Sequence, residues 1–213
     1  MAVVGILGGS FNPPHRGHLA LARTTLDLGL VQTVLLVPAA HPPHKEIPRD
    51  ADAPTRLRMA ELLAAEDPRL SVDGLELSRS GPSYTIETIR ELMAGRHENR
   101  YRLIIGSDMA RIFASWREFR EILRLAPPLV AGRSGIPFSG LPVPPYPGLS
   151  PEESAILAAG RFPMAPVDIS STAVRHLLQK GADDEELLVW LTRPVFDFIR
   201  ANGLYAARTI VDL

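Results

Sequence analysis

The chain has 213 residues, of which 46% are hydrophobic and 22% charged, with a formal net charge of −1 and no cysteine. This composition predicts a globular protein of one large domain, or of one domain with a small appendage, and excludes disulfides, thiolate metal sites and cysteine nucleophiles. The near-zero charge argues against nucleic acid or an anionic membrane as a partner, and no apolar run is long enough to cross a bilayer. We therefore expect a cytoplasmic protein.

Short apolar runs alternate with amphipathic stretches through the first two thirds of the chain. The apolar runs predict buried strands over residues 3–7, 33–37, 70–75, 101–105 and 129–131. The amphipathic stretches predict helices over residues 19–28, 55–65, 85–94 and 116–125. Strands that alternate with helices predict an α/β fold, a Rossmann-like doubly wound parallel sheet covered by helices on both faces.

The last third of the chain is expected to be helical. The proline-rich stretch 133–150 predicts a long surface loop, and Ser150, Pro151 and Glu153 form the pattern that begins a helix. Further helices are predicted over residues 172–179, 185–191 and 194–201. We therefore expect a sheet domain over residues 1–169, a small C-terminal helical region over 170–205 and a tail over 206–213.

The most informative segment is the run from Gly8 to His18, GGSFNPPHRGH, which lies between the first strand and the first helix. A glycine turn at a helix N-terminus leaves backbone N–H groups free to bind phosphate, and Gly17 removes a side chain where a phosphate would approach. A zinc or nickel site formed by His15, His18, His41 and His44 is the alternative, but it leaves the glycines and the Pro-Pro pairs unexplained.

Three other segments are candidates for ligand contact, each with a plainer structural alternative. Residues 169–175 (ISSTAVR) suit a terminal phosphate, or simply begin a helix. Lys45 and Lys180 are the only lysines among 23 basic residues, so Lys45 is either a specific phosphate contact or a surface residue. Asp108 would bind a ribose or cap a helix, and Trp116 would stack on a flat heterocycle or fill the core.

Taken together, these motifs resemble the nicotinate-nucleotide adenylyltransferase family, within the nucleotidyltransferases that carry a His-x-Gly-His signature. The order of GGSFNPPHRGH, PPHK, GPSYTIET, IGSD, a tryptophan and ISSTAVR matches the bacterial enzymes from residue 3 to about residue 202. Asn12 is aspartate in many members of the family, and both residues form tight turns.

The resemblance implies transfer of AMP from ATP to nicotinate mononucleotide, giving deamido-NAD and pyrophosphate, with Mg²⁺ arriving on ATP and no dedicated metal site. It assigns catalysis to His15, His18 and Lys45. It assigns ATP binding to Gly8, Gly9, Ser10, Phe11, His18, Gly106, Asp108, Ile169, Ser170, Ser171, Thr172 and Arg175. It assigns the pyridine nucleotide to Ser10, Lys45, Ser83, Tyr84, Thr85, Trp116 and Arg133. The C-terminal helical region would complete the ATP site.

Alternatives remain at this point. One is a related adenylyltransferase that acts on nicotinamide mononucleotide or phosphopantetheine. The other is a non-catalytic nucleotide-binding module. Association into homo-oligomers is left open.

Overall fold

The computed structural model describes residues 1–42, 50–132, 146–165 and 169–206. Its centre is a sheet in which neighbouring strands are parallel, in the order β3-β2-β1-β4-β5-β6. The strands are β1 (Val3–Gly9), β2 (Thr33–Pro38), β3 (Leu70–Val72), β4 (Arg100–Gly106), β5 (Leu129–Ala131) and β6 (Arg161–Phe162). The order reverses between β1 and β4, which is where ligands bind in open sheets of this kind.

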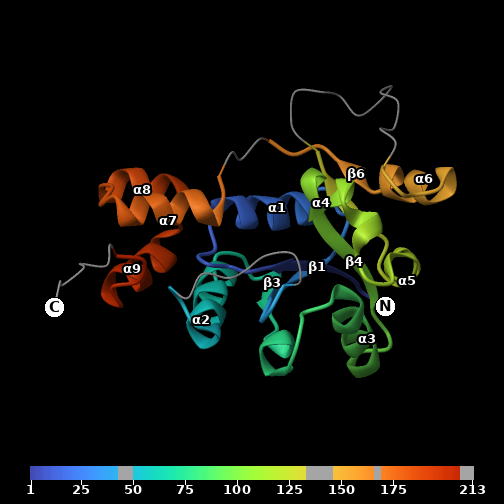
Figure 1. Ribbon diagram of the computed structural model, residues 1–213, viewed down its shortest axis with the longest axis horizontal. Helices are drawn as coiled ribbons and strands as arrows, with labels where there is room; N and C mark the ends of the chain where they lie inside the picture. The colour runs from blue at the N-terminus through green and yellow to red at the C-terminus, as the bar shows by residue number, and fades with distance from the viewer. Residues whose placement is uncertain (43–49, 133–145, 166–168, 207–213) are drawn as a thin grey trace.

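Helices follow most of the strands (Figure 1). They are α1 (Arg16–Asp27), α2 (Ala53–Ala64), α3 (Thr85–Gly95), α4 (Ser107–Arg111), α5 (Phe119–Leu125), α6 (Pro151–Ala159), α7 (Ser171–Gln179), α8 (Asp184–Trp190) and α9 (Arg193–Ala201). Two 3₁₀ turns, η1 (Leu75–Ser78) and η2 (Phe113–Ser115), complete the elements of the described residues. No helix in this part of the chain is long and apolar enough to span a membrane.

The sheet separates two hydrophobic cores because successive side chains of a strand point to opposite faces. Leu7 of β1 belongs to a core with buried residues of α1, α2, α7, α8 and α9. Ile6, the preceding residue, belongs to a second core with α3 and α5. Figure 1 shows α7, α8 and α9 gathered at one end of the molecule beside α1 and α2. The C-terminal helices therefore share a core with the first strand and the first two helices.

The predicted α/β class and the doubly wound parallel sheet are confirmed, and each predicted strand is present. Three local predictions differ from the structure. The helix expected over 116–125 begins only at Phe119, because Glu118 has a left-handed backbone (φ 51°) that interrupts it. The five-residue helix α4 and the two-residue strand β6 were not predicted, since neither is long enough to show a periodic pattern.

Candidate nucleotide-binding site

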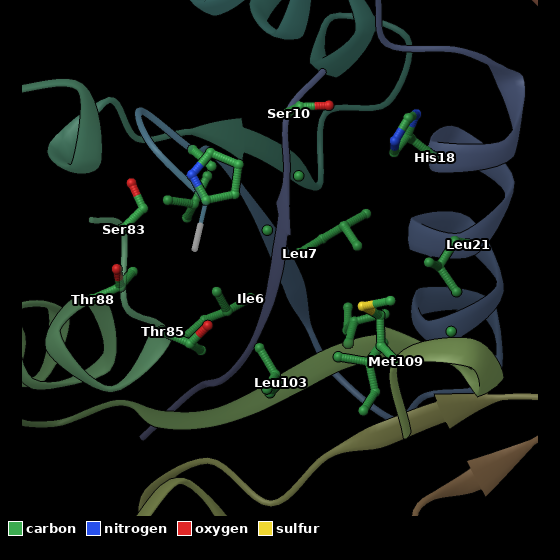
Figure 2. A pocket seen from close by; sticks show the side chains of 18 of the residues that line it. Ile6, Leu7, Ser10, His18, Leu21, Ser83, Thr85, Thr88, Leu103 and Met109 are labelled. Atoms are coloured by element: carbon green, nitrogen blue, oxygen red, sulfur yellow. The ribbon is translucent and has the colours of Figure 1, made fainter. Parts of the chain in front are cut away.

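A cavity of about 700 Å³ lies at the carboxyl edge of the sheet, where β1 and β4 separate. The two strands pair only as far as Ile6 and Leu103, although β1 continues to Gly9 and β4 to Gly106. Figure 2 shows that the cavity extends to both sides of β1. Ser83, Thr85 and Thr88 lie on one side, and His18, Leu21 and Met109 lie on the other.

The two histidines of the HRGH segment form a reciprocal cap at the start of α1. The Nδ1 atom of His15 accepts the Gly17 N–H at 3.1 Å, and the Nδ1 atom of His18 accepts the His15 N–H at 3.2 Å. Their ring centroids are 3.9 Å apart. A nitrogen that accepts a hydrogen bond carries no proton, so in each ring Nε2–H is left as the donor. The cap therefore fixes two N–H donors on rings that line the cavity.

His15 is held in its neutral form. Its side chain is 6% exposed. Burial first, and the neighbouring His18 second, lower the pKa of His15 to about 2. Across the neutral pH range this residue is thus an uncharged hydrogen-bond donor, and it does not act as a titrating acid or base.

We expect the depressed pKa of His15 to make folding stability depend on pH. As the pH falls from 7 to 5, the unfolded chain binds a proton near pH 6.5, whereas the folded chain does not until about pH 2. The free energy of unfolding therefore falls by about 2 kcal/mol between pH 7 and pH 5 through His15 alone. The variant His15→Asn keeps an N-cap acceptor and lacks the titrating ring. Urea unfolding at pH 7 and at pH 5 should show that its free energy of unfolding falls by about 2 kcal/mol less than that of the wild type.

The exposed His97 supplies the control for that measurement. His97→Asn should leave the pH dependence of unfolding as in the wild type. Equal pH dependence in the wild type and His15→Asn would contradict the assigned pKa.

The His15 ring leaves no room for a side chain at Gly17. A Cβ atom at this position would lie 2.8 Å from Nδ1 of His15 and 3.2 Å from Cγ2 of Ile169. The sequence predicts that Gly17 leaves space for a phosphate, and the structure adds that a side chain here would push against His15. Gly17 also lines the cavity, so both reasons apply to it.

The remaining residues of the GGSFNPPHRGH segment fasten it to the C-terminal helices. Arg175 of α7 donates from Nη1 to the Asn12 carbonyl at 2.7 Å, and the Tyr205 hydroxyl donates to Oδ1 of Asn12 at 2.6 Å. The Ser171 hydroxyl donates to the Pro13 carbonyl at 2.9 Å. The Nε–H of Arg16 lies 3.1 Å from the carbonyl oxygens at the end of α8. One face of the segment thus lines the cavity, and the other holds α7, α8 and the residues after α9.

A second network holds the segment 81–84 at the opposite wall. The Ser83 hydroxyl accepts the N–H groups of Ala40 and His41 at 3.0 and 3.1 Å, and it donates to the Glu76 carboxylate. Thr88 donates to the same carboxylate. Burial raises the pKa of Glu76, and the hydrogen bonds from Thr88 and Ser83 oppose that rise. Glu76 thereby ties the start of α3 to the loop after β2.

The N-terminus of α3 opens on this side of the cavity. Tyr84 is its N-cap residue, and within the described part of the chain no side chain accepts from the N–H groups of its first turn. Thr85, the first residue of the helix, lines the cavity. Arg117 lies over the Tyr84 ring, 4.6 Å from its centroid, and Trp116 lines the cavity beside them. A helix N-terminus flanked by aromatic rings suits a flat anionic group.

The structure brings most of the predicted site residues to this cavity. Those that line it are Gly8, Gly9, Ser10, His15, His18, Ser83, Tyr84, Thr85, Gly106, Asp108, Trp116 and Ile169. Phe11 does not line it: the side chain is 0% exposed and its ring lies 4.9 Å from the His18 ring. Ser170, Ser171, Thr172 and Arg175 lie at the start of α7, outside the cavity lining. Lys45, His44 and Arg133 lie outside the described residues.

Several lining residues were not predicted from the sequence. Leu21 and Met109 add apolar side chains on the α1 side and Thr88 lies on the α3 side, and Glu76, Ile112, Arg117 and Met164 also line the cavity. Leu21 was recognisable, since it lies one turn beyond His18 on the same helix. Met109, Ile112 and Arg117 follow the IGSD segment. Met109 lies in α4, Ile112 is the C-cap residue of that helix and Arg117 comes after η2, and both elements are too short to show a periodic pattern.

Comparison with known proteins agrees with this geometry. A family model described as cytidylyltransferase-like matches residues 6–177. This match includes both the parallel sheet and the histidine cap, and it places the protein in a class of nucleotidyltransferase enzymes.

Curated relatives identify the family within this class of enzymes. A probable nicotinate-nucleotide adenylyltransferase of Geobacillus thermodenitrificans is 34% identical over 211 residues, which are 99% of this chain and 89% of the relative. One of Thermus thermophilus is 37% identical over 95% of this chain and 98% of the relative. The chain belongs to the nicotinate-nucleotide adenylyltransferase family.

A solved structure shares the fold at much lower sequence identity. The Plasmodium falciparum nicotinic acid mononucleotide adenylyltransferase complexed with NaAD superposes with a TM-score of 0.72 at 16% identity. The match covers 96% of this chain and 98% of that one.

Proposed function

We propose that the protein transfers AMP from ATP to nicotinate mononucleotide, forming deamido-NAD and releasing pyrophosphate in NAD biosynthesis. The observation that carries this proposal is the cavity that spans β1, with two fixed histidine donors and a glycine turn between its halves. Transfer of an adenylyl group from one nucleotide to another needs two binding regions that bring the phosphates of the two nucleotides together. Family membership supports the same reaction.

The α3 side of the cavity takes the pyridine nucleotide in this proposal. The uncapped first turn of α3 at Thr85 would bind the nicotinate carboxylate through backbone N–H groups, and Trp116 would stack on the ring. Donors without a matching acceptor favour the acid over the amide, since the amide N–H₂ would be left unpaired. Ser83 and Tyr84 hold this wall, and the sequence adds Lys45 and Arg133 from outside the described residues.

The α1 side takes ATP. Gly106 and Asp108 lie where β4 passes into α4, within reach of a ribose or adenine. Leu21, Met109 and Ile169 supply apolar surface for the base. The β- and γ-phosphates would then extend toward the start of α7, where the family resemblance assigns them to Ser171, Thr172 and Arg175, with Ser170 also in the ATP site. Arg175 donates from Nη1 to the Asn12 carbonyl and from Nη2 to the Thr172 hydroxyl.

The reaction needs positioning and charge stabilisation rather than a covalent intermediate. An oxygen of the acceptor's 5′-phosphate bonds to the α-phosphorus of ATP as the bond from that phosphorus to the β-bridging oxygen breaks, and pyrophosphate leaves with the electron pair. His15 and His18 would donate from Nε2 to the non-bridging oxygens as charge develops, above the turn at Gly8, Gly9 and Ser10. The nucleotide substrate in this proposal is the magnesium complex of ATP.

Pyrophosphate release with different acceptors tests the proposal. The purified protein, supplied with ATP and magnesium, should release pyrophosphate fastest with nicotinate mononucleotide. Nicotinamide mononucleotide and phosphopantetheine should be poor acceptors. Faster release with phosphopantetheine would replace the proposed acceptor, and no release with any of the three would favour a non-catalytic nucleotide-binding module. The cytoplasmic location stays a prediction from the sequence.

A further inference from the structure

Arg56 is a buried arginine that lies behind the cavity. It belongs to the first turns of α2, and it is 3% exposed. Its Nη1 atom donates to the Ser10 carbonyl at 2.9 Å and to the Ala39 carbonyl at 2.6 Å. Ser10 and Ala39 are the residues that directly follow β1 and β2. One guanidinium nitrogen thus joins the ends of the two strands.

These two carbonyl groups bear directly on phosphate binding. Ser10 and Ala39 line the cavity, whereas Arg56 does not, so their carbonyl oxygens are directed to Arg56 behind the loop. A carbonyl oxygen that turned toward a bound phosphate would repel it, because both carry negative charge. The Gly9 carbonyl accepts the Ala39 N–H at 2.9 Å. A third carbonyl of these two loops therefore also has a hydrogen-bond partner within the protein.

Burial of Arg56 is costly: it lowers the pKa of the guanidinium, and the charges of Tyr205 and Asp52 oppose that shift only in part. None of the ion pairs among the described residues includes it, and its Nε–H is buried without a hydrogen-bond partner among them. A buried charge without an ionic partner destabilises a fold, so stability alone does not explain this residue. A positive charge behind a turn that holds polyphosphate does explain it.

We propose that Arg56 is a positioning residue for adenylyl transfer: it holds the Ser10 and Ala39 carbonyls away from the phosphates and fixes the spacing of the loops that follow β1 and β2. This inference rests on the proposed adenylyl transfer. Arg56 does not touch the substrate; it acts through the backbone of residues that do.

Arg56→Met and Arg56→Lys test the proposal. Methionine removes both hydrogen bonds and the charge, and we expect kcat about 30-fold lower, since a misplaced phosphate group loses much of the advantage of fixed geometry. Lysine keeps the charge and a donor, so it should recover part of the loss, to about fivefold below the wild type. The KM for nicotinate mononucleotide should change by less than kcat does, because Arg56 makes no hydrogen bond to the residues on the α3 side of the cavity.

Arg102 provides the matched control. It is also a partly buried arginine that donates to two backbone carbonyls, those of Pro127 and Pro128, at 2.8 and 3.4 Å. It does so just before β5, at the amino edge of the sheet, and it does not line the cavity. Arg102→Met and Arg102→Lys should lower the melting temperature while kcat stays within about twofold of the wild type.

The outcomes separate this inference from the function on which it rests. A wild-type protein without activity on any acceptor contradicts the proposed function. An active wild type with kcat unchanged in Arg56→Met, or with kcat lost equally in the Arg102 variants, overturns the role of Arg56. If Arg56→Met does not fold, Arg56→Lys decides by kcat per folded molecule, and a value equal to that of the wild type overturns the proposal.

Discussion

His18→Ala is expected to lower kcat by at least about 100-fold, the loss typical when one transition-state donor is removed. The cap at the start of α1 explains why the effect should be large. Nδ1 of His18 accepts the His15 N–H, so the ring has one orientation with Nε2–H as its donor, and His18 lines the cavity. Alanine leaves no group within reach of the oxygen on which charge develops.

Steady-state kinetics with ATP and nicotinate mononucleotide would measure this effect. His18→Gln places an amide N–H₂ near the position of Nε2 and should retain more activity than alanine. His176→Ala is the matched control, because this histidine is exposed on α7. A kcat in His18→Ala equal to that of the wild type would exclude His18 from the mechanism.

Gly17→Ala is expected to lower kcat by about 100-fold with little change in stability. The new Cβ would meet Nδ1 and Cε1 of His15 at 2.8 and 2.9 Å, so the imidazole must turn away from the phosphates. Loss of the cap costs about 1 kcal/mol. Alanine is favoured over glycine in a helix by a similar amount. The two changes in the free energy of unfolding nearly cancel.

Melting temperature and kcat, measured together, check this prediction. Gly95→Ala is the control: Gly95 lies at the end of α3, and a Cβ there would meet no atom within 4 Å. That variant should keep its activity. An active Gly17→Ala enzyme would mean that the His15 ring need not occupy the observed orientation.

Much of the fold could be predicted because its buried strands are continuous apolar runs separated by amphipathic helices. β1 is an example: Val3 to Leu7 is wholly apolar apart from one glycine, and the turn that follows has a distinctive sequence. The break between η2 and α5 was not predictable, since it depends on one left-handed residue, Glu118, within a sequence that favours a helix.

The site was predictable where its sequence is unusual, and not where it depends on ordinary residues in the core. Arg56 and Arg58 lie two positions apart on α2, one buried and the other exposed. A signal was present: Arg56, Met59, Ala60 and Leu63 have the spacing of one helix face, and the other three are apolar. A charged residue within an apolar stripe indicates a buried role, although the sequence does not identify its partners.

The attachment of the GGSFNPPHRGH segment to the C-terminal helices has a consequence for synthesis of the protein. Asn12 is held by Arg175 and Tyr205, which lie 163 and 193 residues further along the chain. A ribosome therefore adds residues as far as Tyr205 before both supports of this turn exist. Prematurely terminated chains would lack this support even though they contain both histidines, so they should not consume ATP. Tyr205, near the end of the described residues, thus determines when the GGSFNPPHRGH segment is fully held in place.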